Sequence, residues 1–162
     1  VTPEGGLKIT MYFVNEMVID PDYLNHYYFK TMHHEFAHIL NQIKPYSTDF
    51  NAISGPDYVT DTWSDAWASE REAQQNGFIS EYASSEHGED FVELLSIYVT
   101  NTPEYWNNVL KNAGAGAEKI NAKFEIVYNY MLNSWNIDLN ELRDIIQRRQ
   151  GEIDTLDLET LN

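Results

Sequence analysis

The sequence predicts a single α+β domain that is mostly α-helical, and three observations support this fold class. The chain has 162 residues, which suits one domain with one sizeable core. Hydrophobic residues make up 43% of it, so a folded protein is expected. Helical periodicity and capping residues recur from about residue 20 onward, whereas a short N-terminal stretch alternates like a β-strand.

The first element is a small N-terminal β element followed by a long helix. The stretch LKITMYFVNEMVI is rich in β-forming residues and predicts a strand over about Lys8–Asn15. Asp20 then fits a helix cap, with Pro21 in the first turn. The helical pattern continues to Lys44, in one or two pieces, and Pro45 ends it.

The middle of the chain predicts shorter elements. Residues 45–68 are rich in turn-forming residues, which indicates mostly loop with short helical turns. A short helix is expected over 69–77, and a connector follows. Ser85 fits the cap of a helix over about 87–100. The apolar side of that helix would carry Phe91, Leu94, Leu95 and Tyr98.

Three further helices are expected in the C-terminal part, about 101–151. Thr102 and the proline after it open the first, and the second spans roughly Ala117–Asn133. Asp138 and Glu141 resemble a capping box that opens the last helix. The acidic tail, 152–162, is expected to fray. We therefore divide the single domain 1–162 into a motif-bearing part, about 5–100, this helical part and the tail.

Composition excludes several classes of function. The formal net charge of −16 argues against a nucleic-acid partner and against an anionic membrane surface, because both would repel the chain. The absence of cysteine excludes disulfides and thiolate metal sites. No apolar run approaches the length of a membrane-spanning segment.

The motif HExxH lies in the first long helix, as His34, Glu35 and His38. Residues four apart share one helix face, so both histidines can direct a ring nitrogen at one metal ion. Glu35 can then reach a water on that ion without ligating it. The alternative is an amphipathic helix with surface histidines.

Zinc requires a third protein ligand, and the candidates are carboxylates. No histidine follows at the short spacing that metzincins use. Glu89 and Glu93 are four apart on the helix expected over 87–100, so that face can supply a ligand and an acceptor for a ligating histidine. The alternative is a pair of solvated glutamates on an acidic helix.

The helical glutamates after HExxH resemble the gluzincin pattern of zinc peptidases. More narrowly, Tyr82, Glu89, Phe91 and Glu93 are similar to the lethal-factor-like zinc endopeptidases, where a tyrosine precedes the ligand glutamate by seven residues. Thermolysin-type gluzincins have Asp where this chain has Glu93, whereas the lethal-factor-like group has Glu.

The chain most resembles the zinc-binding metallopeptidases of bacterial surface lipoproteins. The segments HEFAHIL, DF with a following IS, GFIS with a following YA, and EDFVE occur in the order typical of that family. The resemblance covers about residues 5–100. It implies a zincin-like fold, an extracytoplasmic location and a lipid anchor on a segment absent here.

This resemblance also implies roles for the site residues. His34, His38 and Glu89 would bind one Zn²⁺ per chain, with a fourth position open for water. Glu35 would act as general base on that water, and Tyr82 would donate to the developing oxyanion of a protein or peptide substrate. Glu93 would orient a zinc-binding histidine. Zincin analogy also suggests that substrate adds to the strand at Lys8–Asn15.

Two further expectations concern the whole protein and its function. Zincin domains often have a larger β-sheet ahead of the active-site helix, and only 33 residues precede His34 here. We therefore expect the natural protein to extend before Val1. The alternative function is a metal-binding but non-catalytic accessory module of a surface nutrient-uptake system. The presence of both Glu35 and Tyr82 argues against it, because such a module needs neither base nor oxyanion donor.

Other acidic and histidine residues are expected to have ordinary roles. Asp57, Asp61 and Asp65 recur every four residues but lack the spacing of a calcium loop, so a solvated face is favoured. His33 points about 100° away from His34 on the helix, which indicates packing or surface. His87 is expected at the surface.

Overall fold

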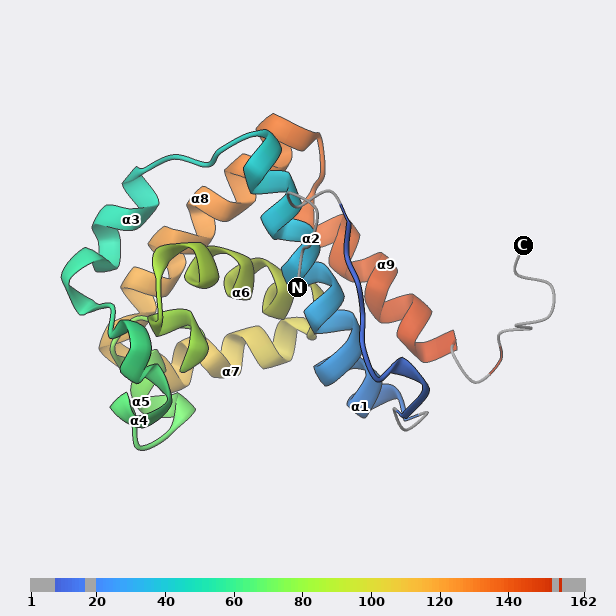
Figure 1. Ribbon diagram of the computed structural model, residues 1–162, viewed down its shortest axis with the longest axis horizontal. Coiled ribbons are helices and arrows are strands. Elements are labelled where there is room, and N and C mark those ends of the chain that lie inside the picture. Colours follow the sequence, from blue (N-terminus) through green and yellow to red (C-terminus); the bar gives the residue numbers. More distant parts are fainter. Residues whose placement is uncertain (1–7, 17–19, 153–154, 156–162) are drawn as a thin grey trace.

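The computed structural model describes residues 8–16, 20–152 and 155, and within them the molecule is all α (Figure 1). The α-helices are α1 Pro21–Leu24, α2 Lys30–Ile43, α3 Asp49–Ser54, α4 Trp63–Ala66, α5 Glu70–Gln75, α6 His87–Thr100, α7 Pro103–Ala113, α8 Ala117–Trp135 and α9 Leu139–Glu152. Short 3-10 turns lie at Val14–Glu16, Gly55–Asp57, Thr60–Thr62, Tyr82–Ser84 and Gly114–Gly116. The tail expected to fray lies almost wholly outside the described residues.

The predicted N-terminal strand is wrong, and with it the α+β class. Residues 8–12 have no regular structure, Phe13 has a φ of 62°, and Val14–Glu16 forms a 3-10 turn. A strand needs a hydrogen-bonding partner, and the described part of the chain contains no other strand. The apolar side chains therefore do not alternate between a core and solvent: Tyr12 is 63% exposed and Phe13 74%. Without a strand here, the expected substrate-pairing edge is absent from this segment.

The long helix predicted to end at Lys44 is present, with a widened turn in it. Asp20 caps α1, because its carboxylate accepts a hydrogen bond from the Tyr23 amide, and Pro21 opens the helix as expected. Asn25–Phe29 then forms a π-helical segment that leads into α2. Single π turns inside α-helices are frequent near functional sites.

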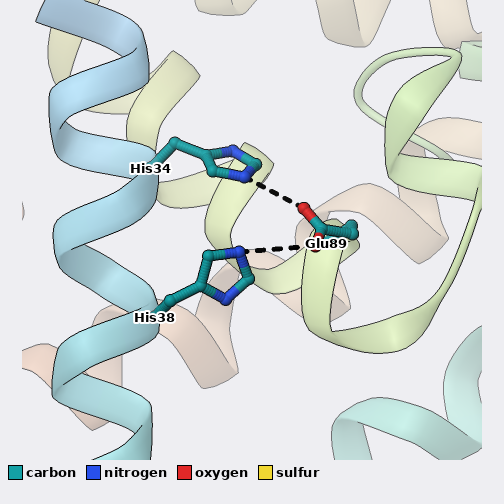
Figure 2. Close-up of side chains that lie close together, drawn as sticks. All are labelled: His34, His38 and Glu89. Atoms are coloured by element: carbon teal, nitrogen blue, oxygen red, sulfur yellow. Dashed lines mark ion pairs between the residues drawn. The ribbon is translucent and has the colours of Figure 1, made fainter. Parts of the chain in front are cut away.

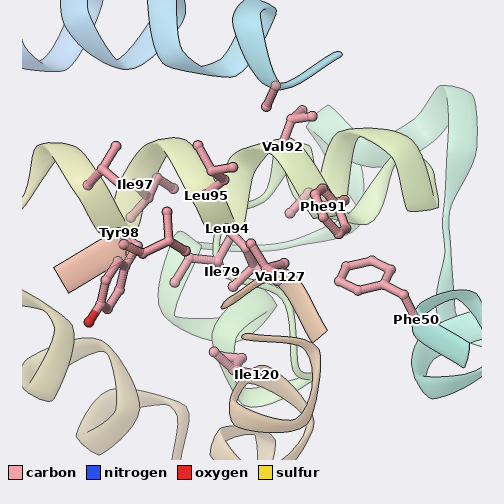
Figure 3. Close-up of a cluster of buried hydrophobic side chains, with 14 of the residues drawn as sticks. Phe50, Ile79, Phe91, Val92, Leu94, Leu95, Ile97, Tyr98, Ile120 and Val127 are labelled. Carbon is pink, nitrogen blue, oxygen red and sulfur yellow. The ribbon is translucent and has the colours of Figure 1, made fainter. Parts of the chain in front are cut away.

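Helix α6 forms the centre of the core. It contacts α2, α8 and α9, and Figure 1 shows it in the middle of the molecule. Every residue from Asp90 to Thr100 is buried, so the helix is enclosed on all sides rather than on one apolar side. Figure 3 shows its apolar side chains meeting Phe50 from α3, Ile79 from the connector, and Ile120 and Val127 from α8.

Three of the four helix caps expected from the sequence are confirmed, at Asp20, Thr102 and Asp138. The Thr102 hydroxyl accepts a hydrogen bond from the Tyr105 amide at α7, and the Asp138 carboxylate accepts from the Asn140 amide before α9. The expected Ser85 cap is wrong. The cap position of α6 is Glu86, whose side chain makes no capping hydrogen bond. None of the helices in the described residues has the length and apolar character needed to span a bilayer.

Candidate metal centre

The two histidines of the HExxH motif face the same point from helix α2. His34 and His38 are one turn apart, and their ring centroids lie 5.0 Å from each other. Figure 2 shows both rings directed at Glu89, which lies in the first turn of α6. Two helices that are far apart in sequence thus bring the three predicted ligands together.

The candidate ligand atoms lie close together. Glu89 Oε2 lies 2.9 Å from His34 Nε2, and Glu89 Oε1 lies 3.4 Å from His38 Nε2. One ligand atom from each of the three residues lies within 4.8 Å of the other two. Although Glu89 Oε2 is buried, it has no hydrogen-bond partner among the described residues. The carboxylate therefore faces the histidines without a well-aligned hydrogen bond at this oxygen.

This arrangement fits a zinc ion. Ligand atoms about 2.0–2.2 Å from a tetrahedral zinc lie about 3.3–3.6 Å from one another. The 3.4 Å between His38 Nε2 and Glu89 Oε1 falls in this range, whereas the 2.9 Å between His34 Nε2 and Glu89 Oε2 is shorter. Two imidazoles and one carboxylate are a known donor set for catalytic zinc. This fit rests on the type and placement of the donor atoms.

Glu93 determines which nitrogen of His34 faces the candidate site. Its Oε1 lies 2.9 Å from His34 Nδ1, and its side chain is 2% exposed. A carboxylate only accepts hydrogen bonds, so Nδ1 carries the proton and donates it. The lone pair of Nε2 is thereby left for a metal ion.

Sequence reasoning missed two partners of Glu93. Lys30 Nζ lies 3.0 Å from Glu93 Oε1, and the Ser80 hydroxyl donates to Glu93 Oε2 at 2.7 Å. A signal for Lys30 was available, because it precedes His34 by four residues on the same helix. Ser80 comes from the connector before α6, and no local pattern links it to Glu93.

A pocket of about 250 Å³ opens beside the candidate ligands. It is lined by Lys30, Thr31, His34, Glu35, Tyr82 and Glu93. Glu35 is half-buried, and Tyr82 belongs to the 3-10 turn that precedes α6. The Tyr82 ring stacks on His34 at 6.0 Å between centroids and meets Trp63 edge-on at 5.0 Å. Both predicted catalytic side chains therefore line the same space as the candidate metal ligand His34.

The charges of the site are strongly coupled. Burial by itself would lower the pKa of His34, but its contacts with Glu89 and Glu93 raise that pKa to about 9. Burial would raise the pKa of Glu89, yet both histidines bring it well below its usual range. The pKa of Glu93 is also lowered, because His34 and Lys30 outweigh burial. Burial, followed by the charge of Glu89, raises the pKa of the Tyr82 hydroxyl and keeps it protonated.

Three residues expected to have ordinary roles, Asp57, His87 and His33, make contacts or have environments of their own. Asp57 forms an ion pair of 2.7 Å with Lys119. His87 is exposed, and its Nδ1 lies 3.0 Å from the Tyr46 hydroxyl. His33 is half-buried, and burial lowers its pKa. None of the three belongs to the His–Glu cluster found in the described residues.

Comparison with known proteins agrees with this geometry. The family described as "putative zinc-binding metallo-peptidase" matches residues 1–140. A crystal structure of a protein from Bacteroides caccae, with the same description, is 39% identical and has a TM-score of 0.84 over 91% of this chain. The chain covers 57% of the length of that protein. No curated protein matches the chain. With a family match over most of its length, the chain belongs to this zinc-binding metallo-peptidase family.

Proposed function

We propose that the chain is a zinc-dependent peptidase that hydrolyses peptide bonds in a protein or peptide substrate. The observation that carries the proposal is the placement of one candidate metal ligand, a carboxylate and a phenol around one open pocket. His34, Glu35 and Tyr82 line that pocket together. A purely structural zinc site is usually closed by four protein ligands, whereas here three are supplied beside an open space.

His34, His38 and Glu89 would hold the ion. When bound, zinc polarises a water and the substrate carbonyl, which makes attack on a peptide bond feasible near neutral pH. The Glu93 carboxylate keeps the proton of His34 on Nδ1. Glu93 thus fixes the orientation of one ligand ring without touching the reacting atoms.

Glu35 would act as the general base. From its position in the pocket it accepts a proton as a water attacks the substrate carbonyl, and it then returns that proton to the leaving amine. The Tyr82 hydroxyl, whose raised pKa keeps it protonated, donates a hydrogen bond to the oxygen on which negative charge develops. The stacked and edge-on rings of His34 and Trp63 hold the phenol in place.

The decisive experiment separates metal binding from turnover. Purified wild-type protein and Glu35→Gln are incubated with a mixed peptide library, and cleavage is read by mass spectrometry beside zinc content. We expect wild type to cleave with about one zinc per chain, and Glu35→Gln to keep its zinc and lose cleavage. Glu125→Gln, an exposed residue of α8, serves as the matched control and should cleave like wild type.

Two results would contradict the proposal. Zinc bound by wild type without cleavage of any peptide would favour a non-catalytic binding module instead. Equal cleavage by wild type and Glu35→Gln would remove Glu35 from the role of base. Besides Glu35, the only carboxylate among the described residues that line the pocket is that of the buried Glu93.

A further inference from the structure

An ion pair lies fully inside the molecule, and its acidic member is the residue next to the candidate ligand Glu89 in α6. Lys123 Nζ from α8 lies 2.6 Å from Asp90 Oδ2, and both side chains are 0% exposed. The Tyr58 hydroxyl donates to the same oxygen at 2.8 Å. Removing two charges from water is unfavourable, and apolar residues of similar size often stabilise a core as well or better. The pair therefore invites a role beyond holding α6 against α8.

Its position in the sequence suggests that role. Asp90 directly follows Glu89, and both lie in the first turn of α6. This turn has no side-chain cap, since Glu86 makes no capping hydrogen bond. An uncapped first turn leaves amide groups without partners inside the helix and tends to fray. Glu89 thus lies on a part of the helix whose own hydrogen bonds define it least.

Contacts from outside α6 hold this turn in addition to those with the two histidines of α2. The Tyr46 hydroxyl lies 3.0 Å from His87 Nδ1, and the Tyr46 ring stacks on Phe91 at 4.1 Å between centroids. Asp90 is held by Lys123, while Glu89 faces the two histidines. Because successive residues are 100° apart on a helix, fixing Asp90 also fixes the direction of Glu89.

We propose that Lys123, acting through Asp90, is a positioning residue that holds Glu89 at the distance and angle required of a zinc ligand. This inference rests on the proposed function in one respect, namely that Glu89 binds the metal. Ligands must be held within about 0.5 Å of their working geometry. Lys123 belongs to a different helix from every candidate ligand, so it ties the first turn of α6 to a rigid part of the core.

The test measures zinc affinity in variants that keep all three candidate ligands. Lys123→Met removes the charge, and Tyr58→Phe removes only the hydroxyl that donates to Asp90. Ile120→Ala is the matched control, because Ile120 is fully buried on the same helix and its loss creates a cavity in the apolar core (Figure 3). The dissociation constant for zinc is measured by competition with a chelator, at a temperature where circular dichroism shows each protein to be folded.

We expect Lys123→Met to weaken zinc binding about 10- to 100-fold, as loss of a group that orients a ligand does. Tyr58→Phe should weaken it about threefold, which corresponds to one hydrogen bond. Ile120→Ala should remain within about twofold of wild type despite its lower stability, because its apolar side chain makes no hydrogen bond or ion pair with Asp90 or the ligands. A purely structural role for the pair would lower stability alone and leave the zinc affinity unchanged.

Each contrary result has a distinct meaning. Wild-type zinc affinity in both Lys123→Met and Tyr58→Phe would overturn the inference, as would an equal loss in Ile120→Ala. If Lys123→Met fails to fold, Tyr58→Phe decides alone, and an unchanged affinity overturns the inference. A wild-type protein that binds no zinc would overturn the proposed function itself. A wild type that binds zinc and cleaves peptides, with unaffected variants, would refute only the role of Lys123.

Discussion

His34 Nδ1 donates to Glu93 Oε1 across 2.9 Å, and the opposite nitrogen of the same ring lies 2.9 Å from Glu89 Oε2. The ring is therefore held between two carboxylates of one helix, one turn apart. The carboxylate at Nδ1 is 2% exposed and bound by Lys30 and Ser80 as well, so it cannot easily move. The other carboxylate borders the candidate metal position.

Glu93→Gln should weaken zinc binding about 10- to 100-fold without removing a ligand. The neutral amide keeps the shape of the side chain but loses the charge that holds the proton on Nδ1 and that pairs with Lys30. Chelator competition gives the dissociation constant. Glu125→Gln, which is exposed on α8, should bind zinc like wild type. An unchanged zinc affinity in Glu93→Gln would show that the negative charge of Glu93 is not needed to orient the His34 ring for zinc binding.

Glu89→Ala should lose most of the bound zinc, because two histidines alone leave the ion one protein ligand short. Metal content after dialysis, measured by atomic emission, checks this. Glu86→Ala makes a suitable comparison, since Glu86 is exposed one turn earlier and its side chain caps nothing. If Glu89→Ala retained all its zinc, the third ligand would have to come from elsewhere.

Tyr82→Phe should lower kcat about 10²- to 10³-fold while zinc content and KM change little. The substitution removes the hydroxyl and keeps the ring that packs on His34 and Trp63. Steady-state kinetics on a peptide that wild type cleaves would separate kcat from KM. Tyr105→Phe, at an exposed position of α7, should behave as wild type. A change in KM alone would instead assign Tyr82 to substrate binding.

The metal-free protein should lose stability as the pH rises from 6.5 to about 9. The pKa of His34 is raised from 6.5 to about 9 by Glu89 and Glu93, against the opposing effect of burial. A raised pKa means that the folded state binds the proton more tightly, so the stabilisation is complete below pH 6.5 and disappears through pH 9. The raised pKa of His34 adds about 3 kcal/mol to the free energy of unfolding below pH 6.5, and this contribution is lost by about pH 9. Burial lowers the pKa of His33 from 6.5, so its shift is opposite in direction to that of His34.

Urea unfolding of chelator-treated protein at several pH values measures this effect. His34→Gln cannot titrate at this position and is the reference that removes contributions from other groups. The difference in unfolding free energy between wild type and His34→Gln should shrink across the interval. A difference that stays constant from pH 6.5 to 9 would show that folding does not raise the pKa of His34 in the metal-free protein.

The features that could be predicted from sequence are those that a single helix or its end determines. His34, Glu35 and His38 share a helix, so their spacing alone specifies their relative directions. Helix starts at Asp20, Thr102 and Asp138 follow from capping side chains a few residues away. The likeness of the segment around Tyr82 and Glu89 to zinc peptidases indicated which residues would join them.

The failed predictions concern structure that depends on distant partners. Lys8–Asn15 has β-forming residues, but a strand forms only against another strand, and none lies in the described part of the chain. Ser85 has a suitable side chain for a cap, but the chain enters α6 one residue later, at Glu86. In both places the local preference of the residues, for a strand at Lys8–Asn15 and for a helix cap at Ser85, was outweighed by the tertiary structure around them.

By itself, then, the sequence determined the HExxH helix, most helix boundaries and the residue types of a zinc site, because these depend on contacts over a few residues. The tertiary structure alone decided that Ser80 holds Glu93 and that Lys123 meets Asp90 in the core. Lys123 lies 33 residues from its partner. No periodicity connects two such residues, because their meeting depends on how α6 and α8 pack.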